Sequence, residues 1–366
     1  MEAVAAGSHL PSLTSLRWFA ASAVFLSHIS ALVLGTSLAG AWAIFGPQGA
    51  VGVSFFFILS GFVLGWADRP GDTWRAFYRR RVARIVPAYL VACLAGFVIA
   101  VWVAPLNGGG GGVLTNLLPM TLLQAWSADP YTYYAGNSVS WSLSVEVFFY
   151  ALFPFVVRPI LRLQPPGLMR LLAASVAFAI VLPLALSPSH QDTGLGFWAI
   201  YINPGYRLAE FVAGIALAGL LRAGVRIRVP VAVAMLLAAE AYVLVNAVPM
   251  YASRVAVTII PFCLLIFVCA QADVSGKWTG LRHRRLIKLG QWSFAFYLVH
   301  QLVLRVLEIH VPAPLDSSSG RLALALLGYA AATAIAYALF RLVEEPWERR
   351  IRRGRRVVLP APAPAL

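Results

Sequence analysis

Several ionisable side chains lie within stretches of sequence that are otherwise apolar, where charge is costly and therefore indicates function. The first stretch contains Arg17 and His28, eleven residues apart. That separation is about three helical turns, so both side chains lie on one helix face, about 16 Å apart along the axis. An imidazole can take up a proton near neutral pH, which makes His28 a candidate general base. The alternative is structural: a snorkelling arginine and a hydrogen-bonded core histidine.

A second group of charges, residues 79–84, lies immediately before another apolar run. Positive charge at the end of a membrane span sets topology and explains several of these arginines. Arg81 and Arg84 are three residues apart, on one helix face, where two guanidinium groups can hold one anion. This pair is therefore able to bind one anion at the membrane surface.

A third group centres on Glu146, which lies among aromatic residues in an apolar run. Ser142 and Tyr150 lie on the same helical face, one turn to either side of it. A carboxylate in such a run must be paired or protonated, so Glu146 is a catalytic candidate, expected to tune or orient His28. The alternative is a buried structural ion pair.

Four further polar residues are expected to support the site: Ser60, Ser142, Tyr297 and His300. Tyr297 and His300 share one helix face. We expect His300 to pack and orient neighbouring groups rather than to act as the base. Arg207 and Glu210, three residues apart, are expected to form a structural ion pair. Glu240, Arg305 and Glu308 are also intramembrane and receive no role from the sequence.

The elements that carry these residues must cross a membrane. Of 366 residues, 60% are hydrophobic and only 12% are charged, against about 25% charged in an ordinary globular domain. The mean hydropathy of +0.78 excludes a soluble enzyme, a disordered chain and a fibrous protein. We predict an all-α polytopic membrane helix bundle, with residues 1–366 as a single domain and no soluble C-terminal extension.

Ten apolar runs are long enough to cross about 30 Å of hydrocarbon. They are 13–34, 50–66, 85–104, 140–157, 168–187, 206–221, 229–247, 252–270, 287–309 and 322–343. An eleventh run, 113–127, is short and contains Pro119 and Gln124. We predict that it is a re-entrant or interfacial segment, which needs protein or water around its irregular backbone.

The basic residues predict the orientation of the bundle. Most of the 29 Lys and Arg lie in alternate connections between the predicted spans, which places these connections and both termini in the cytoplasm of a cell-membrane protein. Topology thus explains the net charge of +15, and no nucleic-acid partner is expected. Cys93, Cys263 and Cys269 lie in apolar runs without metal or redox spacing, so no metal site is expected.

Six segments, in this order, resemble the family-three integral membrane acyltransferases. They are residues 16–17 with His28, then 55–62, 80–87, 141–146, 297–300 and 343–346. The resemblance covers nearly the whole chain. It implies transfer of an acyl group from a coenzyme A thioester to a hydroxyl, usually on a carbohydrate.

The resemblance also implies roles for single residues. His28 matches the catalytic histidine and Glu146 the glutamate of the fifth helix, while Arg17, Arg81 and Arg84 match the donor-binding residues. Acetyl-CoA or another short-chain acyl-CoA would be a co-substrate, and no permanently bound cofactor is implied. Residues 10–17 are similar to relatives that acylate macrolide sugars, so the expected acceptor is a macrolide sugar or a surface polysaccharide.

The chemistry of acyl transfer needs a base for the hydroxyl proton and a cationic site for the coenzyme A phosphates, and these residues supply both. No serine has a neighbouring base at fixed spacing, so we expect direct transfer in a ternary complex rather than an acyl-enzyme. Two other classes stay open. Ten spans with internal charges also suit a transporter or flippase of a glycoconjugate, and a non-catalytic envelope partner would leave His28 dispensable.

Overall fold

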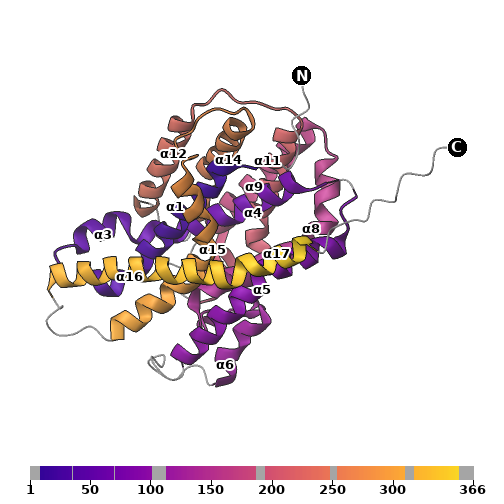
Figure 1. Cartoon of the computed structure of the whole chain (residues 1–366). Helices are drawn as coiled ribbons and strands as arrows, with labels where there is room; N and C mark the ends of the chain where they lie inside the picture. Colours follow the sequence, from indigo (N-terminus) through magenta and orange to yellow (C-terminus); the bar gives the residue numbers. More distant parts are fainter. Residues whose placement is uncertain are drawn as a thin grey trace.

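The structure is a computed structural model that describes residues 9–34, 36–69, 71–100, 113–186, 194–247, 254–309 and 317–353. Within these ranges the regular elements are helices and no strand occurs (Figure 1). The predicted all-α membrane bundle is therefore confirmed. The α-helices are α1 Pro11–His28, α2 Ser30–Val33, α3 Ala39–Phe45, α4 Gly52–Ala67, α5 Trp74–Val98, α6 Val113–Leu117, α7 Pro130–Tyr133, α8 Trp141–Leu161, α9 Pro165–Leu186, α10 Leu195–Phe197, α11 Pro204–Arg222, α12 Val231–Leu244, α14 Ile259–Val274, α15 Arg284–Ile309, α16 Ser318–Leu339 and α17 Glu345–Arg353.

Eight helical segments of the described chain are long and apolar enough to cross a membrane. They are Ala39–Ala67, Trp74–Val98, Ser138–Leu161, Pro165–Leu186, Leu195–Arg222, Arg254–Val274, Arg284–Ile309 and Ser318–Ile351. Each coincides with one of the ten predicted spans. The two remaining predicted spans are occupied by α1 and by the shorter apolar helix Val231–Ala247.

Helix α1 is not among these eight segments, and neighbouring protein contacts the polar residues at its N-terminal end. The backbone N–H and the hydroxyl of Ser12 donate to the Asp273 carboxylate at 2.8 and 2.7 Å. The Ser15 hydroxyl donates to the Leu281 carbonyl at 2.6 Å. Neighbouring protein thus satisfies the polar groups, as membrane depth requires.

The first predicted span, residues 13–34, is wrong at its C-terminal end. Helix α1 stops at His28, and the chain turns at Ile29 before the short helix α2. His28 is therefore the last helical residue, beside the last carbonyl groups of α1, which have no partner within the helix. That position favours positive charge through the helix dipole.

The third predicted span, residues 85–104, starts too late. Helix α5 already begins at Trp74, where the Thr73 hydroxyl accepts a hydrogen bond from the Ala76 N–H at 3.2 Å. A threonine N-cap of this kind fixes a helix start. Arg81 and Arg84 consequently lie inside the helix rather than before it.

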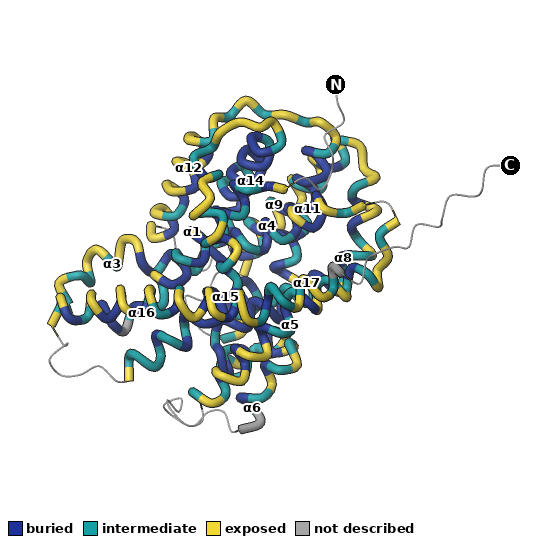
Figure 2. The backbone as a smooth tube through the Cα atoms, in the orientation of Figure 1, coloured by how far each residue is buried: buried dark blue, intermediate teal, exposed yellow. Residues whose placement is uncertain are grey.

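Helices α4 and α11 form the centre of the bundle and are mostly buried (Figure 2). They approach through Gly61 and Gly214: a Cβ on either glycine would come within 2.0 Å of a carbonyl oxygen of the other helix. Such close crossing of small residues is typical of membrane helices. Cys93, Cys263 and Cys269 are free and buried, as the sequence predicted.

The buried pair between Arg207 and Glu210, expected from their spacing, joins these central helices. The guanidinium contacts the carboxylate at 2.9 Å. It also donates to the Ser54 hydroxyl of α4 at 3.1 Å and to the Tyr201 carbonyl at 2.7 Å. The prediction of a structural pair is confirmed.

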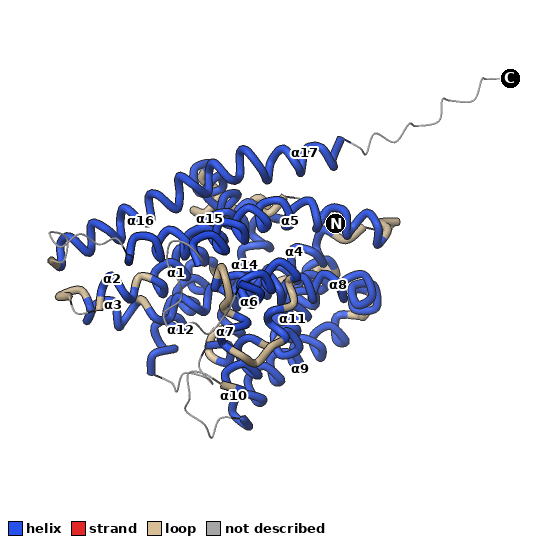
Figure 3. The backbone as a smooth tube through the Cα atoms, turned by 90° about the horizontal axis from the view of Figure 1, so that it is seen from below, coloured by secondary structure: helices blue, strands red, loops and turns tan. Residues whose placement is uncertain are grey.

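The C-terminal helices form one long rod along the side of the bundle (Figure 3). Helix α16 continues through the π-helical turn Phe340–Glu344 into α17. Contacts with α15 hold α16, and α17 packs against α5. The chain thus brings its last acidic motif, residues 343–346, beside the arginines of α5.

Residues 113–127 do not form a membrane-crossing helix, as predicted. They make α6 and the 3₁₀ turns Leu118–Thr121 and Gln124–Trp126. Protein side chains satisfy this irregular backbone: Tyr89 donates to the Pro119 carbonyl at 2.5 Å, and the Ser144 hydroxyl accepts from the Ala125 N–H at 3.2 Å. The segment thus rests on α5 and α8.

Candidate active site

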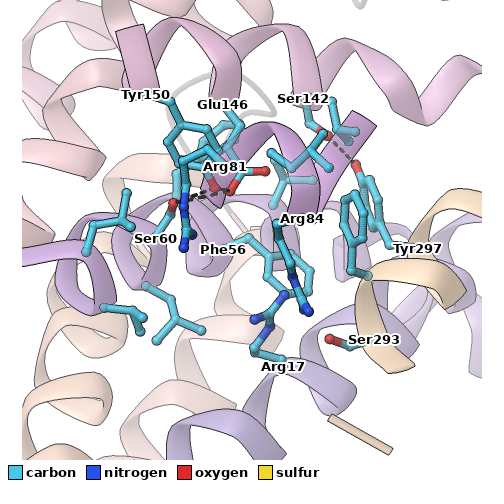
Figure 4. Close-up of a pocket in the computed structure, with 18 residues that line it drawn as sticks. Arg17, Phe56, Ser60, Arg81, Arg84, Ser142, Glu146, Tyr150, Ser293 and Tyr297 are labelled. Atoms are coloured by element: carbon cyan, nitrogen blue, oxygen red, sulfur yellow. Dashed lines mark hydrogen bonds between the residues drawn. The ribbon is translucent and has the colours of Figure 1, made fainter. Parts of the chain in front are cut away.

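A cavity of about 110 Å³ lies between α1, α4, α5, α8 and α15 (Figure 4). We call it the arginine cavity. It contains seven of the nine residues that the sequence selected: Arg17, Ser60, Arg81, Arg84, Ser142, Glu146 and Tyr297. Five helices from different parts of the chain therefore bring three arginines and one glutamate to one site.

Glu146 is held by hydroxyl groups in this cavity. Its Oε1 accepts hydrogen bonds from Ser60 at 3.2 Å and from Tyr150, the residue one turn further along α8. Ser142, one turn back, contacts the Tyr297 hydroxyl at 2.7 Å. The predicted face of Ser142, Glu146 and Tyr150 is confirmed, since all three line the cavity.

Two of the arginines have unused hydrogen-bond donors. The Nε atoms of Arg17 and Arg81 are buried and bond to no atom in the described part of the chain. The guanidinium of Arg81 lies over the rings of Phe77 and Tyr150, at 5.9 Å from each centroid. A buried donor without an acceptor is costly. An anion entering the cavity would remove that cost.

Arg84 has a different environment from Arg81. It is bound by Glu348 of α17 and lies 3.7 Å from the fully buried Glu344 carboxylate. Arg84 is also near enough to Arg17 for their like charges to interact. The sequence named Glu344 only within the segment 343–346 and gave it no role, and it did not single out Glu348; their i, i+4 spacing after an apolar span was the available signal.

A second cavity, of about 680 Å³, adjoins the first. We call it the histidine cavity, because His28 lines it. Its wall is rich in aromatic rings and carries three charged side chains, none of which the sequence placed in a site. The rings are those of Trp42, Tyr131, Tyr134, Trp141, Tyr201 and Tyr297, and the charges are Arg254, Arg305 and Glu308.

Tyr134 lies outside the membrane-spanning segments, on the loop side of the histidine cavity. Burial raises the pKa of its phenol above the ordinary value. The phenol therefore stays neutral at physiological pH and keeps its hydrogen available for donation.

His28 has His300 as its hydrogen-bond partner. Nδ1 of His28 lies 2.9 Å from Nε2 of His300, with the rings inclined by 15°. His300 is fully buried, and its Nδ1 lies 2.8 Å from the Tyr297 carbonyl oxygen. Glu146, which the sequence named to tune or orient His28, instead accepts hydrogen bonds from Ser60 and Tyr150, whereas the hydrogen-bond partner of His28 is His300.

Comparison with known proteins places the chain in a family. Residues 10–341 match the family described as acyltransferase domain. The protein is 40% identical to acyltransferase MdmB of Streptomyces mycarofaciens, over 97% of this chain and 96% of that protein. It is 31% identical to nodulation protein 10 of Rhizobium leguminosarum bv. viciae, over 41% of this chain and 45% of that protein. No solved structure matches. The chain therefore belongs to the family-three integral membrane acyltransferases.

Proposed function

We propose that the protein is a membrane O-acyltransferase that moves an acyl group from acyl-CoA to a hydroxyl of a sugar-bearing acceptor. Membership of an acyltransferase family favours this function over the transporter considered from the sequence. One observation carries the proposal: a cationic cavity and a histidine-lined cavity adjoin each other and share two side chains, Val53 and Tyr297.

The donor is assigned to the arginine cavity. The unused donors of Arg17 and Arg81 support an anionic ligand, and guanidinium groups bind phosphate with charge-assisted hydrogen bonds. Coenzyme A carries phosphates at one end and the thioester at the other, so the arginines would hold one end while the acyl carbonyl extends towards Val53 and Tyr297. The positive-inside distribution supports a cytoplasmic donor and cytoplasmic termini.

The acceptor is assigned to the histidine cavity. Its volume of about 680 Å³ lies within the usual range for small-molecule sites. Flat aromatic rings suit the apolar faces of a sugar, and Glu308 can accept hydrogen bonds from hydroxyl groups. A glycosylated small molecule, of which a macrolide is one class, fits this chemistry. So does the end of a surface polysaccharide.

The reaction assigned to the site is direct transfer. Nε2 of His28 takes the proton of the acceptor hydroxyl while the hydroxyl oxygen bonds to the thioester carbonyl carbon. The carbon–sulfur bond then breaks, and the leaving thiolate takes the proton from the imidazolium. Each cycle yields one ester and one free thiol, and the histidine returns to its neutral form.

The experiment that tests this function uses purified protein in lipid nanodiscs. Acetyl-CoA, propionyl-CoA and butyryl-CoA are each incubated with glycosylated macrolides and with surface oligosaccharides. Free thiol is measured by absorbance and acylated product by mass spectrometry. We expect acceptor-dependent thiol release with a matching mass increase. Acyl-CoA binding without thiol release from any pair would contradict the acceptor class, and absence of acyl-CoA binding would contradict the donor.

A further inference from the structure

The contact between His28 and His300 fixes where the ring hydrogens lie. Nδ1 of His300 is 2.8 Å from the Tyr297 carbonyl oxygen and 3.2 Å from that of Phe296. A carbonyl oxygen only accepts, so Nδ1 of His300 must carry a hydrogen. In a neutral imidazole the other nitrogen, Nε2, then has the lone pair.

The surroundings of His300 favour its neutral form. The side chain is fully buried, and its ring stacks on Phe296 with 5.7 Å between centroids and an angle of 11°. The ring of Phe25 is 6.3 Å away on another side. An imidazolium there would lose its hydration, which is costly for a charge.

The hydrogen position on His300 determines the hydrogen position on His28. Nε2 of His300 lies 2.9 Å from Nδ1 of His28. Because that Nε2 has a lone pair, Nδ1 of His28 must donate, and the lone pair of His28 is then on Nε2. We propose that His300 is a positioning residue: it holds His28 in the tautomer whose Nε2 can accept a proton. This inference rests on the proposed function, in which His28 is the base.

The arrangement also serves the charged state that the reaction creates. When Nε2 of His28 accepts the hydroxyl proton, Nδ1 keeps its hydrogen bond to His300, so the ring does not turn. The imidazolium lies at the C-terminus of α1, where the helix dipole favours positive charge. Two backbone carbonyls therefore orient one histidine, which orients the other.

Nuclear magnetic resonance of nanodisc-embedded protein with ¹⁵N-labelled histidine reads the tautomers directly, since protonated and unprotonated ring nitrogens differ widely in chemical shift. The chain has six histidines, and a His28→Ala sample identifies the signals of His28 by subtraction. We expect the resting protein to show Nδ1 of His28 protonated and Nε2 unprotonated. A protonated Nε2 on His28 would overturn the proposal.

Kinetics of variants test the positioning role. His300→Gln places an amide oxygen where Nε2 was, so it should accept from His28 and keep kcat within about 10-fold of wild type. His300→Leu removes the acceptor and should lower kcat by more than about 10-fold. The loss should not exceed about 10⁴-fold, the effect of a wrong histidine tautomer in a serine protease. Donor KM should not change, because the arginine cavity is untouched.

Tyr329→Phe is the matched control. Tyr329 packs in the same aromatic cluster, against Phe25 and Phe296, and its hydroxyl contacts Ser22 rather than a histidine. It should keep wild-type kcat. Equal kcat for His300→Leu and Tyr329→Phe would overturn the positioning role.

His28→Ala separates the hypothesis that His28 is the base from the hypothesis that His300 sets its tautomer. If His28→Ala retains turnover, His28 is not the base, whichever tautomer it has. If it is inactive while wild-type Nε2 is protonated, only the tautomer inference fails.

Discussion

Val53 of α4 and Tyr297 of α15 form the wall between the two cavities, because each lines both of them. The Tyr297 hydroxyl is fixed by Ser142 at 2.7 Å, whereas Val53 is held only by packing. An acyl group that moves from a donor in one cavity to an acceptor in the other must pass this wall. Its dimensions should therefore limit the acyl chain.

Enlarging Val53 should change acyl-chain preference. Val53→Phe narrows the passage between the two cavities, so turnover with butyryl-CoA should fall by about 10-fold or more relative to turnover with acetyl-CoA. Val53→Ala widens the passage and should shift the preference towards longer acyl chains. A single methylene in a tight pocket is worth about 1–3 kcal/mol. The measurement is kcat/KM for each acyl-CoA. Val63→Phe is the control, since Val63 lines only the arginine cavity; the same shift in both variants would contradict the assignment.

Removing Arg81 should weaken donor binding. A charge-assisted hydrogen bond is worth about 1.5–3 kcal/mol, so Arg81→Ala should raise the dissociation constant for coenzyme A roughly ten- to hundred-fold. Calorimetric titration of nanodisc samples measures this. Arg75→Ala, a neighbouring arginine whose guanidinium lies 5.0 Å from the Trp74 ring outside the cavity, should bind normally. Wild-type affinity in an Arg81→Ala, Arg84→Ala double variant would place the donor elsewhere.

Glu348 competes with an anionic ligand for Arg84. Glu348→Gln removes that competing charge and should tighten coenzyme A binding by a few-fold, with a steeper dependence on salt. The matched control is Glu345→Gln, because Glu345 pairs with Arg341 and Arg349 on the outside of α17. If Glu348→Gln instead binds coenzyme A more weakly than wild type, the Glu348 carboxylate positions Arg84 for the ligand and does not compete with it.

The Arg207–Glu210 pair should matter for stability rather than chemistry. Breaking a buried pair leaves an uncompensated charge and costs about 3–5 kcal/mol, so Arg207→Met should clearly lower the melting temperature. Arg207→Met with Glu210→Met should recover much of it. Tryptophan fluorescence of detergent-solubilised protein measures this. Arg341→Met, which breaks the exposed pair with Glu345, should change stability by less than about 1 kcal/mol. A stable Arg207→Met variant would contradict the structural role.

The sequence predicted which residues of one helix face the arginine cavity, because these residues are spaced by helical turns. Ser142, Glu146 and Tyr150 share a face whatever helix α8 packs against, and polarity alone distinguishes them in an apolar run. Arg207 and Glu210 were likewise identified by their spacing of three residues in an apolar run. Helical periodicity was sufficient to predict which residues lie together wherever all of them belong to one helix.

The relation between His28 and its neighbours could not be predicted in that way. No proline or glycine marks the stop of α1 at His28, where the backbone leaves the helix at Ile29 with φ −82° and ψ 11°. The partner of His28 is 272 residues away on α15, and Glu348 is 264 residues from Arg84. Helical spacing fixes contacts within one helix only, so the sequence named Glu146 as the partner of His28 and left open which group His300 orients.

In the proposed reaction His28 removes the acceptor proton, and the variant His28→Ala tests this role most directly. The variant should fold and bind coenzyme A as wild type does, because His28 does not line the arginine cavity. Its kcat for acceptor-dependent thiol release should fall by about 10²–10⁴-fold, the usual contribution of a positioned base. Near-normal turnover by His28→Ala, with donor affinity unchanged, would contradict the account.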